Sequence, residues 1–481
     1  MSCSTVISLV PDRSTSPSLE SLFQPRSIAV IGASDKPFRI GYQVVKSLID
    51  GGFSGPVYPV NPRLGAVLGQ PVYPSVDAIP TDVDLGIIVL GKDHVLDAVK
   101  ACGQKRMRAI IVMSSGFSEL GNVKAERQLA TEASHYGMRM LGPNCAGYAA
   151  IWEHVYASFE NRVQQGHLAF LSQSGAMCAV ILALARAEAL GLSMFVSYGN
   201  AADVNPEEVL QYLSTHAPTQ LIGCYIEGLR HARAFLSVAR TVAPHKPVLV
   251  LKPGDTPAAA RAIKSHTGAL AGDQALYSGA FHQAGVLQAR NLDEFIDAAK
   301  VLTTQSLPRG NRVAIVTNAG GPSVLAVDDC SHAGLDVHPF PASLRKEFAS
   351  FLPPVCPMAN PVDVGPEAEP GTYQRVIELL LSSSSVDMVL VLCAPPVFAD
   401  IRAISQAVVD SRKTRSTKPL VCCWMAGDMV TAGLPVLVEA KIPDFPTPHR
   451  AAAALRFLVL RSQWLRHQRG RKTVRTVSPQ N

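Results

Sequence analysis

The sequence is poor in charged residues and rich in apolar ones, and this balance excludes several classes of protein. Charged residues make up only 17% of the 481 residues, while 47% are hydrophobic. Disordered chains have the opposite balance, so we expect most of this chain to fold. Gly and Pro number 35 each, far from a collagen-like composition. At about 150 residues per domain, the length indicates roughly three domains.

Disulfide-type cysteine spacings and long apolar runs are also absent. The ten cysteines show no CxxC spacing, and several lie in apolar runs, as Cys224 does in LIGCYIEG and Cys393 in VLVLCAP. Such positions predict buried, reduced thiols, which are typical of a reducing compartment. No apolar stretch reaches the roughly 20 residues that span a bilayer, and residues 1–21 lack the apolar centre of a secretory signal. We therefore expect a cytoplasmic protein without a membrane partner.

Acidic residues are missing from the last part of the chain. The whole sequence has 44 Lys and Arg against 38 Asp and Glu, a net charge of +6. After Asp444 there are eight basic residues and no acidic one, so residues 1–444 carry 36 basic and 38 acidic groups, a net of −2. A nearly neutral body with a basic C-terminal segment indicates a solubilising or partner-docking tail and disfavours a nucleic-acid partner.

One pattern recurs through the rest of the sequence: a short apolar run ends in Gly, Ser or Pro and precedes a segment with helical spacing. Near-continuous apolar strands are typical of parallel sheets buried on both faces. Their alternation with helices predicts βαβ units, which bind ligands beyond the carboxyl ends of the strands. Ten such strands are predicted, at residues 27–34, 84–91, 108–116, 167–175, 192–200, 221–228, 247–254, 312–321, 387–395 and 419–427.

Two gaps in this pattern divide the chain into three α/β units. The segment 145–165 lacks a strong strand pattern, and the polar segment TTQSLPRGN at 303–311 contains Pro and Gly. We therefore predict a flexible terminus, three units and a basic tail, at residues 1–20, 21–150, 151–302, 303–465 and 466–481 respectively.

The first predicted strand runs directly into the turn Gly32-Ala33-Ser34-Asp35-Lys36, and Gly41 opens the following helix. Such a turn can cradle a phosphate with the help of Ser34 and Lys36, or it can be a tight connection that merely needs glycine. Arg63, in YPVNPRLG, is placed to meet a phosphate or is a surface residue of its loop. The turn lacks GxGxxG and no acidic residue ends the second strand, which excludes an NAD-dependent dehydrogenase.

The second unit contains LSQSGAM at 171–177, in which Ser174 and Gly175 would begin a helix. Free backbone N–H groups and the positive end of the helix dipole favour an anion there, and an ordinary N-cap serine is the alternative. The GxSxG elbow of a serine hydrolase is absent, because Leu171 or Ser172 stands where its first glycine belongs.

The most informative stretch is KSHTGALAG at 264–272, in which His266 is surrounded by small residues. A neutral imidazole carries a lone pair at pH 7 and can accept a phosphoryl group. A carboxylate on its other nitrogen would fix the tautomer, and Glu227, at the end of the predicted strand 221–228, could supply it. An incidental surface histidine is the alternative on spacing alone. The other histidines form no HExxH or Cys/His cluster, so no metal site is predicted.

Taken together, these motifs resemble the nucleoside-diphosphate-forming acyl-CoA synthetases, specifically the alpha subunits of ADP-forming acetate–CoA ligases, which are relatives of succinyl-CoA synthetase. The resemblance covers about residues 20–465. It implies an α/β protein with an N-terminal Rossmann-like CoA-binding domain followed by two flavodoxin-like parallel-sheet domains. The motifs that carry it, in chain order, are SIAVIGAS with Gly41, VYPVNP, SSGF, LGPNC, SQSGA, SYGNAADV, YIEG, SHTGALAG, TNAGGP and NPVD.

The resemblance also implies roles for individual residues. His266 matches the histidine that becomes phosphohistidine, and Glu227 matches the glutamate that steadies it. Ser174 and Gly175 match the helix start that holds phosphate, and Asn144, in LGPNC, belongs to the architecture of the site. The region that would hold CoA contains Gly32, Ser34, Lys36, Gly41 and Arg63.

The implied reaction is reversible and converts acyl-CoA, phosphate and ADP into a carboxylic acid, CoA and ATP. Three α/β units use up the chain, so the resemblance implies that ADP or ATP and magnesium bind a separate ATP-grasp beta subunit in a hetero-oligomer. The basic tail is a candidate contact with that partner. The alternative is a non-catalytic CoA-binding regulatory module related to protein acetyltransferases, although such modules typically lose the histidine that this chain retains at His266.

Overall fold

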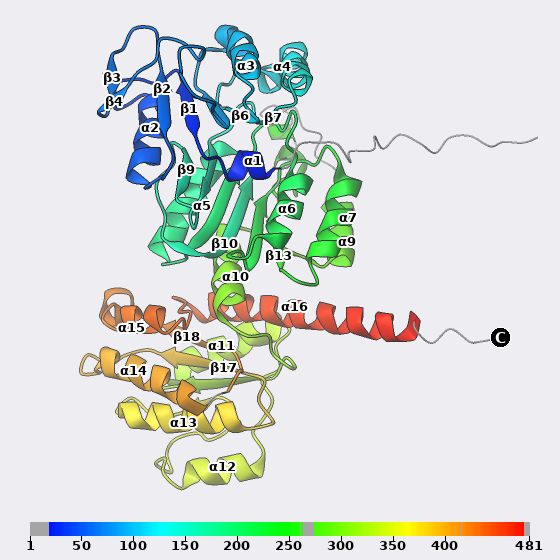
Figure 1. Ribbon diagram of the computed structural model, residues 1–481. Helices are drawn as coiled ribbons and strands as arrows, with labels where there is room; N and C mark the ends of the chain where they lie inside the picture. Colours follow the sequence, from blue (N-terminus) through cyan, green and yellow to red (C-terminus); the bar gives the residue numbers. More distant parts are fainter. Residues whose placement is uncertain (1–18, 260, 263–273, 415, 476–481) are drawn as a thin grey trace, which may run out of the picture.

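The structure is a computed structural model that describes residues 19–259, 261–262, 274–414 and 416–475. Within these residues the strands form three larger sheets and one small hairpin. Figure 1 shows the resulting α/β units stacked along the molecule: the first lies against the second, and the third follows below α10 and α16. The predicted α/β class with parallel sheets is confirmed, and so are the ten predicted strands.

The first sheet is wholly parallel, with the order β2-β1-β5-β6-β7. All residues of its inner strands β1, β5 and β6 are buried, because helices pack on both of its faces. A hairpin of β3 (Ala66–Val67) and β4 (Gln70–Pro71) follows β2. The strands are β1 (Ile28–Ile31), β2 (Val57–Val60), β5 (Leu85–Ile88), β6 (Ala109–Val112) and β7 (Arg139–Leu141), and the helices are α1 (Glu20–Phe23), α2 (Ile40–Asp50), α3 (Val95–Gln104) and α4 (Val123–His135).

The second sheet has the order β14-β13-β12-β10-β11-β8-β9, with β8 and β9 antiparallel to their neighbours. These two strands come from the segment 145–165, in which the sequence shows no strong strand pattern. The strands are β8 (Gly147–Ala150), β9 (Val155–Ser158), β10 (Gln165–Ser172), β11 (Leu192–Ser197), β12 (Leu221–Tyr225), β13 (Val248–Leu251) and β14 (Val286–Ala289). The helices are α5 (Gly175–Ala187), α6 (Pro206–Thr215), α7 (Ala232–Val242), α9 (Gln274–Ala284) and α10 (Leu292–Thr304).

The third sheet is parallel, with the order β16-β15-β17-β18. Its strands are β15 (Val313–Thr317), β16 (Val362–Asp363), β17 (Met388–Cys393) and β18 (Leu420–Trp424). Its helices are α11 (Gly320–His332), α12 (Ala342–Ala349), α13 (Pro370–Ser382), α14 (Ile401–Ser411), α15 (Leu434–Glu439) and α16 (Pro448–Arg475).

The three parallel arrangements share one topology, because the first parallel strand lies between the second and the third in each. The neighbours of β1, β10 and β15 are therefore reached on opposite sides, and in such sheets ligands bind at the carboxyl end of the strand where this happens. Local sequence supports the helices that follow. Asn205 and Glu208 form a capping box at the start of α6, and the side chain of Asn291 accepts the Glu294 N–H at the start of α10.

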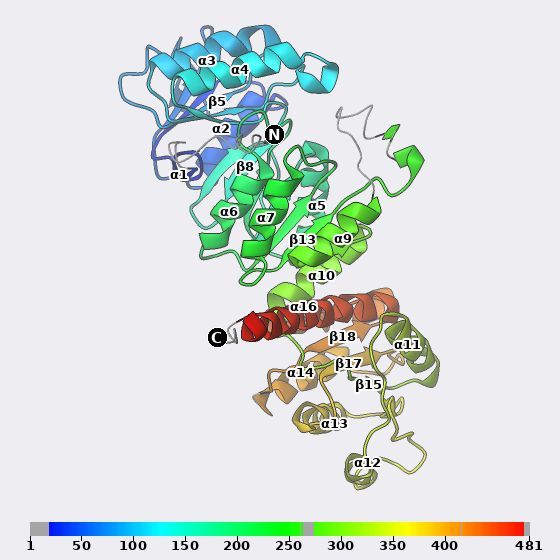
Figure 2. The same cartoon turned by 90° about the vertical axis from the view of Figure 1, so that its right-hand side faces the viewer.

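Helix α16 joins the second and third units. It contacts α10 on one side and α11 on the other, and Figure 2 shows it running below α10. Arg450, in its first turn, binds Asp297 of α10 through two contacts of 2.8 and 2.7 Å. The helix continues past residue 465, where the sequence predicts the basic tail to begin. The predicted tail therefore begins within this helix, on which Arg466 and Arg469 are exposed.

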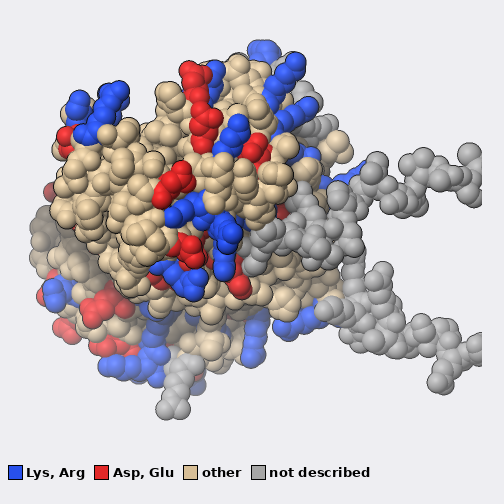
Figure 3. All heavy atoms as spheres, turned by 45° about the horizontal axis from the view of Figure 1, so that its top comes forward, with Lys and Arg blue, Asp and Glu red and all other residues tan. Residues whose placement is uncertain are grey.

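Charge is mixed on the visible face of the first unit, where Figure 3 shows basic and acidic side chains interspersed. None of the described helices combines the length and the hydrophobicity that a bilayer span requires. Among the described residues, all nine cysteines are buried and outside disulfides, as the sequence predicts for reduced thiols.

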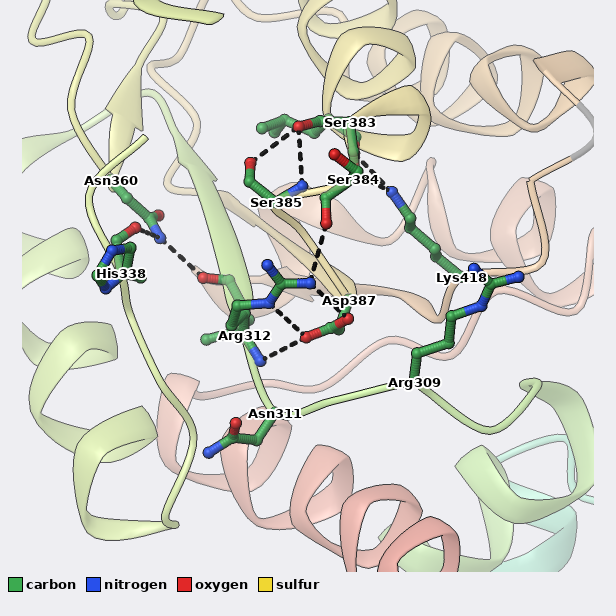
Figure 4. Close-up of polar contacts among 12 residues, drawn as sticks. Arg309, Asn311, Arg312, His338, Asn360, Ser383, Ser384, Ser385, Asp387 and Lys418 are labelled. Atoms are coloured by element: carbon green, nitrogen blue, oxygen red, sulfur yellow. Dashed lines mark hydrogen bonds and ion pairs between the residues drawn. The ribbon is translucent and has the colours of Figure 1, made fainter. Parts of the chain in front are cut away.

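At the amino edge of the third sheet a charge pair links β15 to β17 (Figure 4). Asp387 is only 5% exposed and accepts two bonds from the guanidinium of Arg312, at 2.8 and 3.0 Å, and a third from the Arg312 backbone at 3.1 Å. The guanidinium also donates to the Ser384 carbonyl at 2.9 Å. These contacts join the two strands at the amino edge of the sheet. Parallel sheets bind ligands at the other edge, beyond the carboxyl ends of the strands.

Candidate functional site

A cleft of about 1560 Å³ lies between the first and second units. It is lined by the segments that follow β6, β7, β10, β11 and β12, each at the carboxyl end of its strand. The motifs SSGF, LGPNC, SQSGA, SYGNAADV and YIEG all contribute to these segments. Side chains and turns from both units therefore face one space, among them those of Ser115, Asn144, Ser174, Asn200 and Gly228.

The N-terminus of α5 opens onto this cleft. Ser174 is the N-cap residue, and its hydroxyl accepts the Met177 N–H at 3.3 Å. Gly175 and Ala176, in the first turn, line the cleft, and N–H groups at such positions have no acceptor within the helix. The hydroxyl of Ser172 donates to the Ser174 carbonyl at 2.6 Å and holds the turn. The predicted N-cap bond is present, and the same turn presents helix-start N–H groups of the kind that bind anions.

Glu227 lies at the end of β12 and is only 6% exposed. The side-chain oxygen of Gln173 accepts the N–H groups of Glu227 and Gly228, at 2.9 and 3.1 Å, and ties β12 to the turn that begins α5. The Tyr225 hydroxyl donates to a carboxylate oxygen of Glu227 at 3.4 Å. Burial and the neighbouring Glu227 carboxylate both raise the pKa of Tyr225, so its hydroxyl stays protonated and available as a donor.

A polar network crosses the cleft between the two units. The side-chain amide of Asn200 donates to Glu119 at 2.6 Å and to Glu126 at 2.8 Å, and Arg230 binds Glu126 at 3.2 Å. Burial opposes ionisation of Glu119, but hydrogen bonds from Asn200 and from the backbone at Gly116 lower its pKa below the usual range. The first unit supplies the two carboxylates and the second supplies the donors.

Asn144 lies at a close contact between the loops of the two units. Its backbone is left-handed, with φ of +57°, and its side chain donates to Asn200 at 3.2 Å. Gly199 faces it with φ of +55°, and a Cβ at this glycine would lie 2.2 Å from the Asn144 carbonyl oxygen. Only glycine fits there, because a side chain would push the loops of the two units apart.

The turn after β1 lies beside the cleft. Gly32 has φ of +95°, and a Cβ there would lie 2.2 Å from the Val89 carbonyl oxygen, whereas a Cβ at Gly41 would lie 2.1 Å from the Gly32 carbonyl. Helix α2 therefore packs directly on the turn. Ser34 accepts the Lys36 N–H at 3.1 Å, and Ile40, the first residue of α2, lines the cleft. Lys36, in this turn, and Arg63, in the loop after β2, are both exposed.

His266 lies outside the described residues. The segment that contains it follows β13, and β13 pairs in parallel with β12, the strand that ends at Tyr225 two residues before Glu227. The chain thus leaves the sheet, before this segment, at the same carboxyl edge that carries Glu227 and the start of α5.

Comparison with known proteins identifies the family. Three family models match consecutive parts of the chain: a CoA binding domain at residues 26–150, a succinyl-CoA ligase like flavodoxin domain at 165–302 and a ligase-CoA domain at 313–469. The alpha subunit of the ADP-forming acetate–CoA ligase II of Pyrococcus furiosus is 39% identical, over 92% of this chain and 97% of its own length. The alpha subunit of ligase I from the same organism is 38% identical over 93% and 98%.

This chain belongs to the family of ADP-forming acetate–CoA ligase alpha subunits. The structure agrees: the dinucleotide-forming acetyl-coenzyme A synthetase 1 of Candidatus Korarchaeum cryptofilum, solved with phosphate and ADP, superposes with a TM-score of 0.89. That match has 34% identity and covers 96% of this chain and 99% of the other. The predicted family and the predicted acid–CoA ligase class are confirmed.

Sequence reasoning missed several groups that the ligase fold brings to the cleft. Gln173 and Asn200 lie inside the quoted motifs SQSGA and SYGNAADV, yet no role was predicted for them. Their positions within these motifs were the available signal. Glu119, Glu126 and Arg230 lie outside the motifs, and the sequence offers no pattern that would pair residues so far apart.

One cleft residue is excluded as a nucleophile by its surroundings. Cys145 lines the cleft, but burial raises the pKa of its thiol to about 12, so the reactive thiolate is scarce at neutral pH. Within the residues that the structure describes, no group of three or more His, Cys, Asp or Glu side chains is placed to hold a metal ion.

Proposed function

We propose that this chain carries the acyl-phosphate and phosphohistidine chemistry of an ADP-forming acid–CoA ligase, with His266 as the phosphoryl carrier and Glu227 as its carboxylate partner. The carrying observation is the joint position of two groups at one edge of the second sheet. The start of α5 opens onto the cleft, and Gln173, next to Ser174, holds the backbone of Glu227. Neighbouring strands lie about 4.8 Å apart, so an anion at the helix start would be near this carboxylate.

The proposed reaction has three balanced steps. An oxygen of bound phosphate attacks the thioester carbonyl of acyl-CoA, the C–S bond breaks, and CoA leaves as its thiolate. A ring nitrogen of His266 then attacks the phosphorus of the acyl phosphate, the P–O bond to the acyl group breaks, and the acid leaves as its carboxylate. Finally, an oxygen of the β-phosphate of ADP takes the phosphoryl group, the P–N bond breaks, and ATP forms.

Each protein group has a physical task in this scheme. The N–H groups at Ser174, Gly175 and Ala176 offset the charge of phosphate, and they are oriented before the reaction begins. Glu227 accepts the second ring N–H of His266 and balances the positive charge that develops when the ring is phosphorylated. Tyr225, which donates to Glu227, keeps that carboxylate oriented. Phosphoryl transfer mainly requires such positioning and charge stabilisation.

The first unit would bind CoA, with its phosphates at the turn where α2 packs on Gly32. The absence of room for a Cβ at Gly32 and Gly41 supports this assignment, because it lets the N-terminus of α2, which favours phosphate, lie directly on the turn. Ser34, Lys36 and Arg63 would meet the phosphates, and Asn144 would hold the loops of the two units in register. The relatives named as alpha subunits support a partner. We propose an ATP-grasp beta subunit that binds ADP or ATP with magnesium.

Phosphoryl labelling tests the proposal. The chain is incubated with γ-phosphate-labelled ATP, with and without a candidate beta subunit, and protein-bound label is examined for lability in acid and stability in base. We expect label of this kind with the partner and none in His266→Ala. The control His332→Ala removes an exposed histidine at the end of α11 and should keep the label.

The outcome also separates the enzyme from the regulatory alternative. Label that persists in His266→Ala would place the carrier elsewhere and contradict the proposal. A chain that binds CoA but takes no label with any partner would instead favour a CoA-binding regulatory module.

A further inference from the structure

A second cavity lies between α9, β14 and the C-terminal helix α16. Its volume is about 1160 Å³, and it shares no lining residue with the cleft described above. Small-molecule sites usually occupy about 300–1,000 Å³, so this cavity can hold a ligand of nucleotide size. Its wall is mixed: Phe281, Leu287 and Leu460 supply apolar surface, and Arg290, just after β14, and arginines of α16 supply charge.

Arg461 is the unusual residue of this wall. Its side chain is only 3% exposed, and it makes no hydrogen bond or ion pair within the described residues. Its Nη1 atom is shielded from water and has no acceptor. The Cζ atom of its guanidinium lies over the ring of Trp464, 5.5 Å from the ring centroid. Burial alone lowers its pKa to about 10. A buried charge without a counter-charge is costly, and proteins seldom keep one without a reason.

The surrounding charges do not balance Arg461. Among the described residues that line the cavity there are four arginines and a single acidic residue, Asp255. Arg290 is already bound to Glu294 at 2.7 Å, and Arg466 donates to the Arg309 carbonyl. The charge of Arg456 acts on the carboxylate of Glu294, but no hydrogen bond holds Arg456 within the described residues. Arg461 is therefore the guanidinium without a counter-charge, Arg456 keeps free N–H donors, and the field of both attracts anions.

The wall holds Arg461 in a fixed orientation. Gly285 has φ of +78°, and a Cβ there would lie 2.2 Å from the Trp464 ring, so the indole packs directly on backbone. The guanidinium of Arg461 in turn lies over this ring. A planar, oriented guanidinium can recognise phosphate through paired N–H donors, which an ammonium group cannot do.

We propose that this cavity binds an organic phosphate of nucleotide size, with Arg461 and Arg456 holding its phosphate groups and the apolar wall contacting its organic part. An anion bound there compensates the charge that the protein leaves unbalanced. Because the cavity lies between α16 and the second unit, its occupation stabilises the contact between the second and third units. The site is independent of the phosphohistidine chemistry proposed for the cleft.

Calorimetric titration of the full chain with ADP, in the absence of any beta subunit, tests this site. We expect a Kd of about 0.1 mM or below, and at least a tenfold weaker Kd in Arg461→Met. Arg345→Met, on the exposed face of α12, is the matched control and should bind ADP normally. Inorganic pyrophosphate should displace ADP, because the phosphates are the recognised groups.

Thermal melting distinguishes a loss of ADP binding from a loss of folding. Arg461→Met should melt at or above the temperature of the natural chain, since it replaces an unpaired buried charge with a side chain of similar size. Should that variant fail to fold, Arg456→Gln provides the same test and should weaken ADP at least fivefold. The proposal is overturned by a Kd for ADP above about 1 mM, by unchanged affinity in these variants, or by failure of pyrophosphate to compete.

Discussion

The turn after the first parallel strand of the second unit and the corresponding turn of the third unit are built from matching contacts. Ser172 ends β10 and its hydroxyl donates to the Ser174 carbonyl at 2.6 Å, just as Thr317 ends β15 and donates to the Ala319 carbonyl at 2.9 Å. Gln173 accepts N–H groups beyond β12, and Asn318 accepts the Ala394 N–H beyond β17 at 2.9 Å.

The two turns differ in the side chains that this shared backbone presents. Where the second unit has Ser174 and Glu227, the third has Ala319 and Ala394 at the matching positions. The two turns have the same backbone hydrogen bonds because both sheets have the same topology and the same backbone groups to satisfy. At these matching positions, only the second unit, which faces the cleft, has a hydroxyl and a carboxylate. The chemical difference between the two edges therefore depends on two positions.

The largest effect is expected from removing the charge of Glu227. Glu227→Gln should lower the rate of acyl-CoA formation with the beta subunit by about 100-fold or more, because a neutral amide cannot balance the charged ring of His266. The measurement is the steady-state rate at saturating substrates. Glu207→Gln is the control: Glu207 is also buried, bonds His231 at 2.9 Å and does not line the cleft. A Glu227→Gln enzyme with more than half of normal activity would contradict the comparison.

The third unit has its buried charge pair at the opposite edge of the sheet (Figure 4), so damage there should affect stability. Arg312→Gln removes the guanidinium that pairs with the buried Asp387, which keeps only the backbone N–H at position 312 and the charge of Lys418, and should lower the free energy of unfolding by about 3 kcal/mol. Arg26→Gln, which breaks the pair of the exposed Arg26 with Asp84 in the first unit, should lower the stability far less, because water screens an exposed charge. Thermal melting of both variants measures the difference.

The pH dependence of this pair has a definite sign. Burial opposes ionisation of Asp387, but the hydrogen bonds and charge of Arg312 outweigh it and lower the pKa of Asp387. A lowered folded pKa gives stability that is present above the unfolded pKa of about 4 and is lost as the pH falls through the folded value. The stability gap between the natural chain and Arg312→Gln should therefore narrow below about pH 4. A constant gap down to pH 2 would argue against the ion pair.

A third comparison uses two glycines at matching register positions. Ser172 pairs with Ser197 and Thr317 pairs with Asp363, so Gly199 and Gly365 each follow two residues later, with φ of +55° and +83°. Gly365→Ala should cost about 1–2 kcal/mol for the left-handed backbone alone. Gly199→Ala also collides with the Asn144 carbonyl and should cost more, about 3 kcal/mol. Equal melting temperatures would show that the loops can move apart freely.

The smallest effect concerns the two helix starts. Ser174→Ala removes an N-cap bond and should cost about 1 kcal/mol of stability. The reverse change, Ala319→Ser, should return only a few tenths, because Pro322 occupies the third helical position and has no N–H to donate. Chemical denaturation of the two variants checks this, and a gain near 1 kcal/mol in Ala319→Ser would contradict it.

Much of the fold could be predicted because the inner strands are apolar along their whole length. Runs such as those of β10 and β17 need two covered faces, and this requirement is visible locally. Strands β8 and β9 were missed because their residues, such as Gly147 and Ala150, are small and only modestly apolar. They become strands because β8 pairs with β11 and β9 pairs with β8, and the position of β11 depends on the whole sheet.

The sequence by itself determined the alternation of buried strands with helices, the turns that need glycine and the motifs that identify an acid–CoA ligase, since each is encoded within a few neighbouring residues. Only the tertiary structure decided that Gln173 holds Glu227, that Asn200 reaches Glu119 and Glu126 of another unit, and that Arg461 is buried without an acceptor. The physical reason is distance along the chain. The contacts join residues tens of positions apart, which strand register brings together, and the burial of Arg461 depends on how α16 packs.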